Sequence, residues 1–356
     1  MIKQNWKLFT MLLLFVVFLV ACSNSKSESN TEAVNSENTN TTEENSGQTE
    51  ATYEPEKPIT IYAPGGAGGG LDITARTLVK VVEETKIVPQ TFSVENVPGG
   101  GQTVGLSQFI SNDPESEDKL LLPSAPIVIN YLRNEATSPY SYADMKPLAQ
   151  LTTDYGAIVV RADSPYQTLE ELYKAIDADQ TAVTFAGGSG AGSMDHIIAM
   201  MPAIEMGTDP KQIKYISYDA GGDAMIALLG GHANALTTGI SEVGQYLESG
   251  EVRVLGVSSP ERLEGIFSEI PTFKESGFDA EFTNWRGLFA VKSMSDEAVA
   301  YWETKLEEIV NSPEWQAELE KNGWGNGFKK SDDFMTYLQE QDKTVLEILE
   351  KMGMAK

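Results

Sequence analysis

Four glycine-rich segments contain the residues of this sequence that best suit the binding of a small anion. They are 65–70, 97–105, 187–193 and 218–223, and each follows a run of β-forming residues. Glycine lets the backbone turn sharply, and a helix that starts beside such a turn adds uncovered amides and the positive end of its dipole. A phosphate or a carboxylate suits this arrangement. For any single segment, a turn with no ligand is the alternative.

Known enzyme motifs fit these segments poorly. The dinucleotide fingerprint needs a sixth-place glycine where this chain has Leu71, Asp195 or Ser193, and no Gly-Lys pair exists for a phosphate-binding loop. Ser193 and His196 share a helical face, but the only nucleophile-elbow match fails at Ala191. Two histidines far apart in sequence give no metal site. We therefore predict no catalytic residue, no metal and no cofactor, and expect His196 to pack or hydrogen-bond near its loop.

The segments around the first two loops predict how those loops are positioned. In order, we predict a strand from Ile59 that ends at Pro64, a helix over 73–84, a strand over 91–96, a short helix over 106–111, a strand over 119–126 and a helix from Ile127. Strand, loop and helix in repetition predict a parallel sheet with covering helices. The fold class is therefore α/β.

A second lobe is predicted beyond two β-like runs at 148–152 and 157–160, which we interpret as a crossing. The elements expected after it are a helix that starts at a capping box over 168–171, helices over 194–205, 224–229 and 240–247, and strands over 182–186, 212–217, 234–238 and 252–258, the last of which can cross back. A strand over 281–291 and helices near 295–311, 313–322 and 331–352 follow. Lobe 1 is predicted from 58–155 and 282–356, lobe 2 from 156–281, with a hinged cleft at the carboxyl ends of strands.

The N-terminal residues predict where the protein is located. Two lysines precede an apolar run, 8–21, that is short for a membrane span and suits a signal peptide. The run ends at Cys22, the only cysteine, so we predict a lipobox with 1–22 as signal peptide and Cys22 as the residue that receives lipid such as palmitate. A simple secretory signal is the alternative. The polar residues 23–57 predict a disordered tether, of the kind typical of Gram-positive lipoproteins.

The net charge narrows the class of ligand. A formal charge of -26 argues against nucleic acid, which needs a basic face. A cleft lined by helix dipoles can still hold a small anion, because local groups set the field there. Arg76 and Arg286 are the cations nearest the loops. A structural salt bridge is the alternative for each, and we favour it for Arg76; Trp285 is expected in the core.

As an ordered series, the motifs resemble the substrate-binding proteins of tripartite tricarboxylate transporters, also called the Bug family. The series comprises Pro64-Gly-Gly with Asp72-x-x-Ala-Arg76, Val94-Glu-Asn-Val-Pro-Gly-Gly-Gly, Phe185-Ala-Gly-Gly-Ser-Gly-Ala-Gly-Ser-x-x-His196, Tyr218-x-x-Gly, Ala227-Leu-Leu-Gly-Gly, Glu261-Arg262, Ile270-Pro-Thr-Phe-x-Glu-Ser-Gly277 and Trp285-Arg-Gly287. It covers nearly all of Ile59–Lys356. The first loop departs from the common pattern through its additional glycines at 68–70.

The resemblance implies a two-lobed, periplasmic-binding-protein-like (type II) fold and an extracytoplasmic solute-binding protein that is not an enzyme. The implied ligand is a di- or tricarboxylate, and Asn284–Gly287 looks like the citrate-type branch. The ligand contacts carried over are Gly65, Gly66, Asp72, Ser124, Ser189, Gly190, Ser193, Tyr218, Gly221 and Thr238. The implied partners are a small carboxylate, transporter membrane subunits and, through the lipid anchor, a membrane, but not nucleic acid. We expect a monomer.

Two other functions stay open on the sequence. A ligand-presenting sensor module would use the same loops and hand its signal to a receptor. A secreted serine hydrolase would use Ser189 or Ser193 with His196 and would turn over esters or amides.

Overall fold

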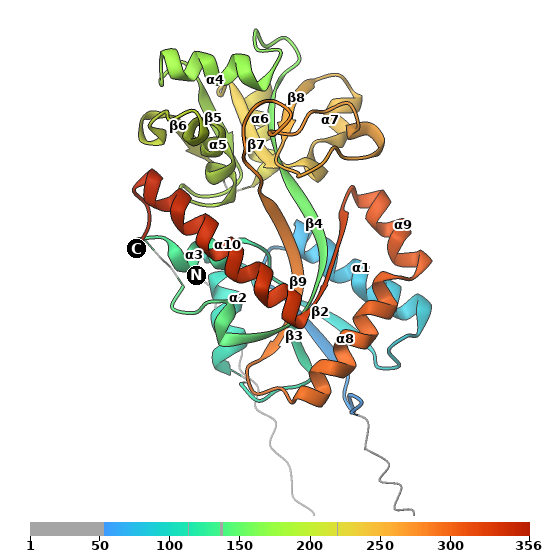
Figure 1. Cartoon of the computed structure of the whole chain (residues 1–356). Coiled ribbons are helices and arrows are strands. Elements are labelled where there is room, and N and C mark those ends of the chain that lie inside the picture. Colours follow the sequence, from blue (N-terminus) through green and yellow to red (C-terminus); the bar gives the residue numbers. More distant parts are fainter. Residues whose placement is uncertain (1–52, 113, 136–137, 219) are drawn as a thin grey trace, which may run out of the picture. The chain divides into compact units, whose positions relative to one another are not determined.

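Parallel strands and short connections build lobe 1. The structure, a computed structural model, describes residues 53–112, 114–135, 138–218 and 220–356 (Figure 1). The first elements are β1 (Ile59–Ala63), α1 (Gly70–Thr85), β2 (Phe92–Asn96), the short 3-10 turn η1 (Gly100–Gln102), α2 (Thr103–Asn112), β3 (Lys119–Leu121) and α3 (Pro126–Leu132). β1 pairs in parallel with both β2 and β3, so the loops that follow these strands meet at one edge.

Two antiparallel strands connect the lobes. β4 (Met145–Arg161) and β9 (Thr283–Val291) pair from Met145 opposite Val291 to Tyr155 opposite Thr283. Beyond Tyr155, β4 continues into lobe 2, where it pairs with β7 (Ala235–Gly239) and β8 (Val252–Val257). The predicted crossing is therefore one continuous strand, with β9 returning beside it.

Lobe 2 repeats the strand, loop and helix plan. Its remaining elements are α4 (Leu169–Ala178), β5 (Thr184–Gly187), α5 (Met194–Glu205), η3 (Pro210–Gln212), β6 (Lys214–Ser217), α6 (Gly221–Leu229), η4 (Ile240–Glu242), α7 (Gly244–Glu248) and η5 (Gly265–Phe267). β5 pairs in parallel with β6 and β7. The loops after β5, β6 and β7 therefore meet, as the loops do in lobe 1.

The C-terminal elements return to lobe 1. They are α8 (Asp296–Val310), α9 (Pro313–Asn322), β10 (Gly325–Lys330) and α10 (Ser331–Met352), after the turn η2 (Tyr142–Asp144) that precedes β4. Ser295 and Ser312 cap α8 and α9 by accepting hydrogen bonds of 3.2 Å from the amides of Ala298 and Trp315. α10 lies along α3 and β4, as Figure 1 shows.

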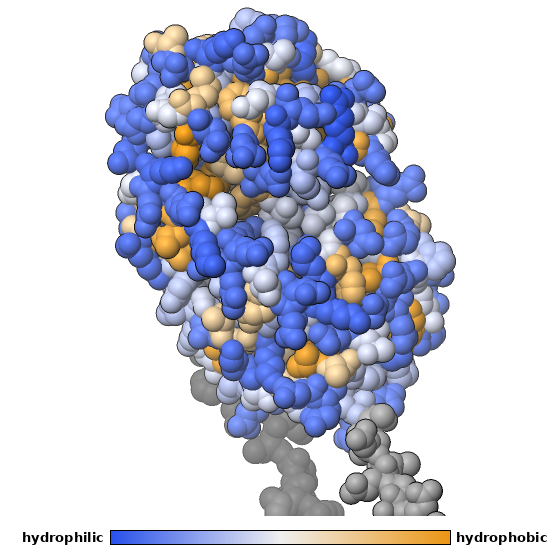
Figure 2. All heavy atoms as spheres, in the orientation of Figure 1, coloured by the Kyte–Doolittle hydropathy of each residue, from blue (hydrophilic) through white to orange (hydrophobic). Residues whose placement is uncertain are grey.

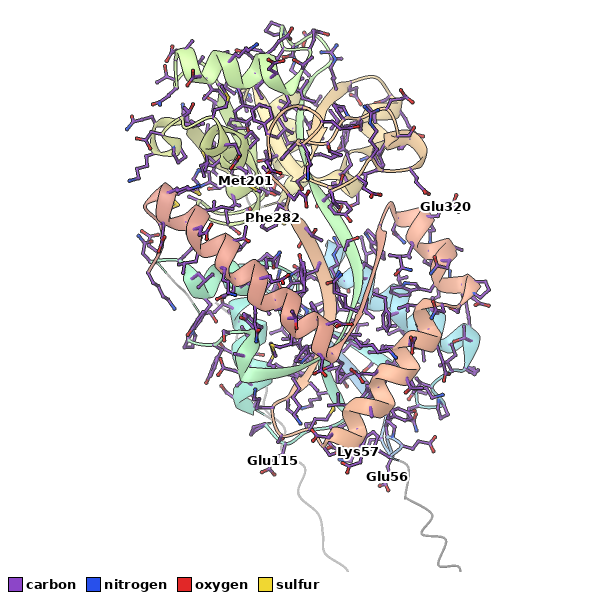
Figure 3. The ribbon with its side chains drawn as sticks, viewed as in Figure 1. Glu56, Lys57, Glu115, Met201, Phe282 and Glu320 are labelled. Atoms are coloured by element: carbon purple, nitrogen blue, oxygen red, sulfur yellow. The ribbon has the colours of Figure 1, made fainter. Side chains whose placement is uncertain are left out.

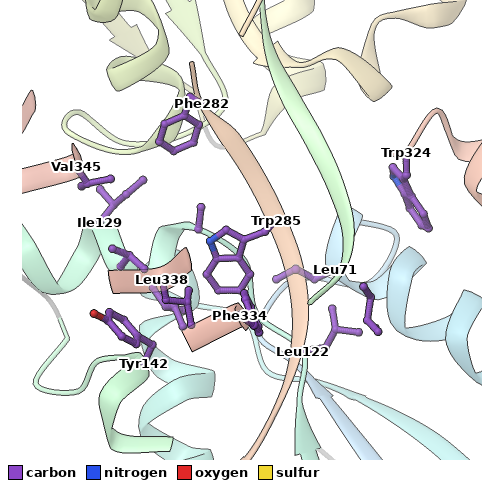
Figure 4. Close-up of a cluster of buried hydrophobic side chains, with 14 of the residues drawn as sticks. Leu71, Leu122, Ile129, Tyr142, Phe282, Trp285, Trp324, Phe334, Leu338 and Val345 are labelled. Atoms are coloured by element: carbon purple, nitrogen blue, oxygen red, sulfur yellow. The ribbon is translucent and has the colours of Figure 1, made fainter. Parts of the chain in front are cut away.

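The core of lobe 1 is built around Trp285 on β9. Figure 4 shows Trp285 pointing from β9 toward α10, where Phe334 and Leu338 lie. The Trp285 and Phe334 rings meet edge to face at 5.1 Å, and the buried indole donates a 2.6 Å hydrogen bond to Gln341 Oε1. The expected core position of Trp285 is confirmed, and its polar atom is satisfied.

Several predicted elements differ from the structure. The strand over 252–258 stays within lobe 2 on β4, because the Ser258 amide and hydroxyl bond to Gly156 and stop it there. The helix over 240–247 is split into η4 and α7. No strand was predicted at β10, whose glycines are required because a Cβ on Gly327 would lie 2.5 Å from Gln150 Nε2.

The described chain begins at the end of lobe 1 that lies away from lobe 2. Figure 3 shows Glu56 and Lys57 beside Glu115 there. The signal peptide, Cys22 and most of the tether fall on residues 1–52, outside the described residues. Within the described ranges, we find no helix that combines the length and the apolar character needed to span a membrane.

Candidate ligand-binding site

The first glycine loop, between β1 and α1, is held by an aspartate of its own helix. Asp72 accepts hydrogen bonds of 2.8 Å from the Gly68 amide and from Arg76 Nε. Burial alone would raise the pKa of Asp72, but these hydrogen bonds outweigh it and lower the pKa. Arg76 is thus a structural ion-pair partner, as expected, and both oxygens of Asp72 are engaged.

Gly65 and Gly66 expose the backbone of this loop. The Gly65 carbonyl accepts a 3.2 Å hydrogen bond from Asn96 Nδ2, which ties the loop to β2. A Cβ on Gly66 would meet nothing within 4 Å. Among the described residues, the amides of Gly66 and Ala67 make no hydrogen bond. They are available to donate to a ligand.

Ser124 lies three residues after the end of β3 and is held by a glutamine of the second loop. Gln102 Nε2 donates to Ser124 Oγ at 2.7 Å, and the Ser124 amide donates to Gln102 Oε1 at 3.0 Å. Gln102 has φ 82°, in the left-handed region that a non-glycine residue seldom adopts. Because Ser124 Oγ accepts from Gln102, its own proton remains available for an acceptor. Gln102 was not among the residues predicted for the site.

The third glycine loop, between β5 and α5, holds three of the predicted contacts. Ser189 Oγ accepts a 3.2 Å bond from the Asp195 amide, and its carbonyl accepts a 2.7 Å bond from the Tyr215 hydroxyl. The Gly190 carbonyl accepts from the Ser193 amide at 2.9 Å. Ser193 occupies the N-cap position as predicted, but its hydroxyl makes no capping hydrogen bond. That hydroxyl is therefore free to act elsewhere.

The titratable residues behind this loop are buried and favour their neutral forms. Burial raises the pKa of Asp195 to about 7, and the charge of Glu242 adds to the rise. Burial lowers the pKa of His196 to about 4. His196 Nδ1 accepts a 2.9 Å hydrogen bond from the Gly192 amide, and its ring stacks on Tyr215 at 4.4 Å. The expected packing role of His196 near its loop is confirmed.

A hydrolase would need a bond from a serine to this imidazole. In the part of the chain that the structure describes, no hydrogen bond joins His196 to Ser189 or Ser193. Within the same ranges, no group of three histidine, cysteine or acidic side chains is placed to hold a metal ion.

The fourth loop and the end of β7 meet at a buried glutamate. Tyr218 is tied back to Gly187 by a 2.8 Å backbone bond. Thr238 Oγ1 donates to Glu242 Oε2 at 2.8 Å, and a Cβ on Gly221 would lie 2.0 Å from the same oxygen. Burial raises the pKa of Glu242, although the Thr238 bond opposes the rise. Glu242 was missed by the sequence analysis; its position just after a strand end is the signal that could have found it.

The structure gathers the predicted contacts into two sets. In lobe 1, the first and second loops touch, since a Cβ on Gly105 would lie 2.6 Å from Pro64 Cβ. In lobe 2, the third and fourth loops touch, since a Cβ on Gly188 would lie 2.2 Å from the Gly221 amide nitrogen. One link between the sets is direct: Arg133 Nη1, at the end of α3, donates to the Ala191 carbonyl at 2.7 Å.

The C-terminal residues reinforce this link. The Asn134 amide donates to the Met354 carbonyl at 2.8 Å and the Lys356 amide donates to the Leu132 carbonyl at 2.9 Å. A Cβ on Gly192 would lie 3.0 Å from Met354 Sδ. The end of the chain thus lies against the third loop.

The face of the molecule seen in Figure 2 has a recess. Residues of intermediate hydropathy lie in it, and hydrophilic residues border it.

Arg286 and Asp154 lie at the crossing strands between the two sets. Their side chains are 7% and 2% exposed, and Arg286 Nη2 lies 3.5 Å from Asp154 Oδ2. The salt bridge considered as the alternative role of Arg286 is therefore present, but its N–O distance of 3.5 Å is long. Asp154 also accepts a 2.7 Å bond from Ser241 Oγ, which fastens η4 to β4.

Comparison with curated proteins identifies relatives over most of the chain. A protein of Cupriavidus necator, described as a UPF0065 protein in the gbd 5' region, is 27% identical over 312 residues, which cover 87% of this chain and 91% of the relative. Protein BugT of Bordetella pertussis is 26% identical over 265 residues, or 73% of this chain and 78% of BugT.

Solved structures share the fold. A TctC solute-binding protein from Polaromonas, determined without ligand, is 28% identical with a TM-score of 0.68, and the match covers 83% of this chain and 99% of that one. R. palustris Rpa4515 with adipate has a TM-score of 0.74 at 20% identity, with 85% and 99% covered. MatC from Rhodopseudomonas palustris with bound malate has a TM-score of 0.70 at 19% identity, with 83% and 99% covered. The two-lobed, periplasmic-binding-protein-like α/β fold is confirmed.

The family profile described as tripartite tricarboxylate transporter family receptor matches residues 75–354. Receptors of this family bind substrate outside the cytoplasm on behalf of a transporter and are not enzymes. With matched residues that run from α1 to the C-terminus and with Bug-type relatives, the chain belongs to the tripartite tricarboxylate transporter family receptors.

Proposed function

We propose that this receptor captures a small di- or tricarboxylate, with a citrate-type ligand favoured, and delivers it to the membrane subunits of a tripartite tricarboxylate transporter. The observation that carries the proposal is the set of unengaged donors on both lobes: the amides of Gly66 and Ala67 and the hydroxyls of Ser124 and Ser193. Backbone amides at helix N-termini suit a ligand with several negative charges, because they donate without mobile side chains.

The ten predicted residues are retained as the proposed contacts, with unequal roles. The amides of Gly66 and Gly190 and the hydroxyls of Ser124 and Ser193 donate to no other group in the described part of the chain and are open to the ligand. The amides of Gly65 and Tyr218 already donate to the carbonyls of Ala63 and Gly187, and the Ser189 hydroxyl bonds to Asp195, so a ligand must share or displace these bonds. Asp72, Gly221 and Thr238 already face Arg76 or Glu242, so a ligand contacts them only by displacing these neighbours. We therefore assign them mainly to shaping the loops.

The carboxylate class is supported by proteins of the same fold that were solved with adipate and with malate. Preference for a citrate-type ligand rests on the resemblance of Asn284–Gly287 to the citrate-type branch. One panel of carboxylic acids therefore tests both the carboxylate class and the preference for a citrate-type ligand.

The first test is thermal unfolding of the full-length protein with citrate, tricarballylate, malate and adipate. A ligand that binds only the folded state at 100 times its Kd adds about 2.7 kcal/mol and raises the midpoint. Triethyl citrate, which has the citrate skeleton without its charges, is the matched control and is expected to leave the midpoint unchanged. A midpoint that no carboxylate moves would contradict the proposed ligand class.

We further propose that the protein is a lipid-anchored monomer on the outer face of a Gram-positive cell membrane, held through Cys22 and the 23–57 tether. The lipobox-like residues before the sole cysteine support this. Metabolic labelling with a palmitate analogue is expected to mark the wild type and not Cys22→Ser, and only the wild type is expected in the membrane fraction. Equal labelling of both proteins would exclude Cys22 as the anchor.

A further inference from the structure

Arg286 is a buried cation where β9 passes the start of α1. Successive strand residues face opposite sides, so Trp285 points toward α10 and Arg286 points the other way. A Cβ on Gly70, the first residue of α1, would lie 2.9 Å from Arg286 Nη2. The guanidinium also lies over the Trp324 ring, with Cζ 5.2 Å from the ring centroid. Its position is therefore fixed by packing.

The hydrogen-bonding capacity of this guanidinium is not used up. Nη1 is fully buried and has no partner among the described residues, while Nη2 makes only a long 3.5 Å contact to Asp154 Oδ2. Asp154 accepts shorter bonds from Ser241 Oγ at 2.7 Å and from the Tyr155 amide at 2.9 Å. A buried cation with an unpaired donor is costly, so this position favours a further acceptor.

The start of α1 adds positive potential at the same place. The first amides of a helix have no partner within it and form the positive end of its dipole. The Arg286 guanidinium packs beside Gly70, the first residue of this helix, so two positive groups lie close together and favour an anion nearby. Asp72 does not supply that anion, because its oxygens bond to Gly68 and Arg76.

The buried acid of lobe 2, Glu242, has a hydrogen-bond partner of its own. Thr238 Oγ1 donates to Glu242 Oε2 at 2.8 Å. Burial and the charge of Asp154 raise the pKa of Glu242, whereas the Thr238 bond and the charge of Arg286 oppose the rise. Asp154 itself is bonded to Tyr155 and Ser241.

We propose that Arg286 binds one carboxylate group of the captured ligand, between its guanidinium and the amides of the β1–α1 loop. The assignment rests on the proposed function and adds a specificity-determining residue to it. A planar guanidinium can donate two parallel hydrogen bonds to the two oxygens of a carboxylate, which an ester or an amide cannot accept equally.

The test is calorimetric titration of the full-length protein with citrate, malate and adipate, followed by the variants with the acid that binds most tightly. Arg286→Gln is expected to bind about tenfold to a hundredfold more weakly, the loss of a hydrogen bond to a charged group. Arg286→Lys keeps the charge opposite Asp154 and loses the two-pronged donor, and it is also expected to bind at least about tenfold more weakly. If Arg286→Gln does not fold, the affinity of Arg286→Lys alone tests the proposal.

Two further variants separate ligand binding from structure. Arg262→Gln removes the same charge from an exposed ion pair with Glu275 and is expected to keep wild-type affinity. Asp154→Asn keeps the hydrogen-bond acceptor for Tyr155 and removes the competing acid, so it is expected to bind as tightly as the wild type or more tightly. If Arg286 were only the partner of Asp154, Asp154→Asn and Arg286→Gln would weaken binding equally.

The outcomes distinguish this assignment from the proposed function. A wild type that binds an acid and an Arg286→Lys variant that binds it equally well would overturn the assignment and leave the proposed function intact. A wild type that binds none of the three acids would overturn both. Weakened binding in both Arg286 variants, with Arg262→Gln unchanged, supports the assignment.

Discussion

The first and third glycine loops follow one plan, and each places an aspartate in the first turn of the following helix. In the first loop, hydrogen bonds from Arg76 and Gly68 overcome burial and keep the pKa of Asp72 low. In the third loop, burial raises the pKa of Asp195 to about 7. The same strand, loop and helix pattern therefore carries one aspartate that is ionised and one that titrates near neutral pH.

The difference comes from what the helix packs against. Four residues after Asp72 is Arg76, on a face of α1 that reaches solvent; four residues after Asp195 is Ala199, on a helix buried along most of its length. A buried helix has no room for a solvated cation beside its aspartate. The loop of lobe 2 is thus more sensitive to pH and to packing than the loop of lobe 1.

The largest expected effect concerns the packing of the two loops. Gly188→Ala is expected to lower the free energy of unfolding by about 3 kcal/mol, the upper part of the usual range for overpacking, because the new Cβ would lie 2.2 Å from the Gly221 amide nitrogen. Gly66→Ala in the first loop meets nothing within 4 Å and is expected to cost below about 0.5 kcal/mol. Urea unfolding measures both, and equal losses would remove the packing difference between the loops.

A second effect concerns the pH dependence of stability. The folded pKa of Asp195 is about 7 against an ordinary 3.8, so the folded state binds the proton more tightly. Asp195 therefore lowers the free energy of unfolding as pH rises from about 4 to about 7, by an amount on the order of a few kcal/mol. Asp195→Asn is expected to lack this decline in urea unfolding measured from pH 4 to pH 8.

His196 makes this test sharper because its contribution has the opposite sign. Its pKa is lowered from 6.5 to about 4, so the folded state binds fewer protons and His196 adds stability as pH rises over that interval. In the wild type, the contributions of Asp195 and His196 to the free energy of unfolding partly cancel as pH rises. In Asp195→Asn, only the His196 contribution remains, so the free energy of unfolding is expected to rise with pH. Identical pH profiles of the two proteins would show that Asp195 is ionised in the folded state.

A third effect concerns the ligand affinity of the third loop. Ser193→Ala removes a hydroxyl that makes no capping bond, so the fold is expected to keep its stability. Ligand affinity is expected to fall by about 1.5–3 kcal/mol, the value of a hydrogen bond to a charged group. Calorimetric titration with the best carboxylate checks this, and an unchanged Kd would remove Ser193 from the site.

The smallest effect concerns the aspartate of the first loop. Asp72→Asn keeps an acceptor for the Gly68 amide and loses the ion pair with Arg76, which is 57% exposed, so we expect a loss of about 1 kcal/mol or less in the free energy of unfolding at pH 7. Because the pKa of Asp72 is lowered, this stability is present above the ordinary aspartate pKa and is lost as pH falls through the folded pKa. A loss that persists at pH 3 would point to loop distortion instead.

Elements that are set by residues close in sequence could be predicted from the sequence. α5 and α9 begin and end at the predicted residues, since Ser193 and Ser312 mark their starts. The union of two β-like runs into β4 depends on pairing with β9 and β7, which distant residues supply. β10 was missed because its glycines lower strand propensity and are explained only by close approach to β4.

In the candidate site too, features set by nearby residues could be predicted and features set by residues distant in sequence could not. The glycine loops could be found from their composition and their order along the chain. The partners that occupy them could not, because Gln102 reaches Ser124 and Glu242 reaches Thr238 and Gly221 only after the chain has folded. The ionisation states of Asp72 and Asp195 were equally hidden, since both read as first-turn acids beside glycine.

The position of the C-terminus has a practical consequence for handling the protein. Lys356 is bonded to Leu132, and Met354, two residues earlier, lies against Gly192, so a purification tag added after Lys356 would begin beside the third loop. A histidine tag would also bring nickel or cobalt ions close to a site proposed for citrate, which chelates them. A fluorescent dye at the same position would also lie beside the third loop, where a carboxylate bound to that loop would add negative charge close to the dye.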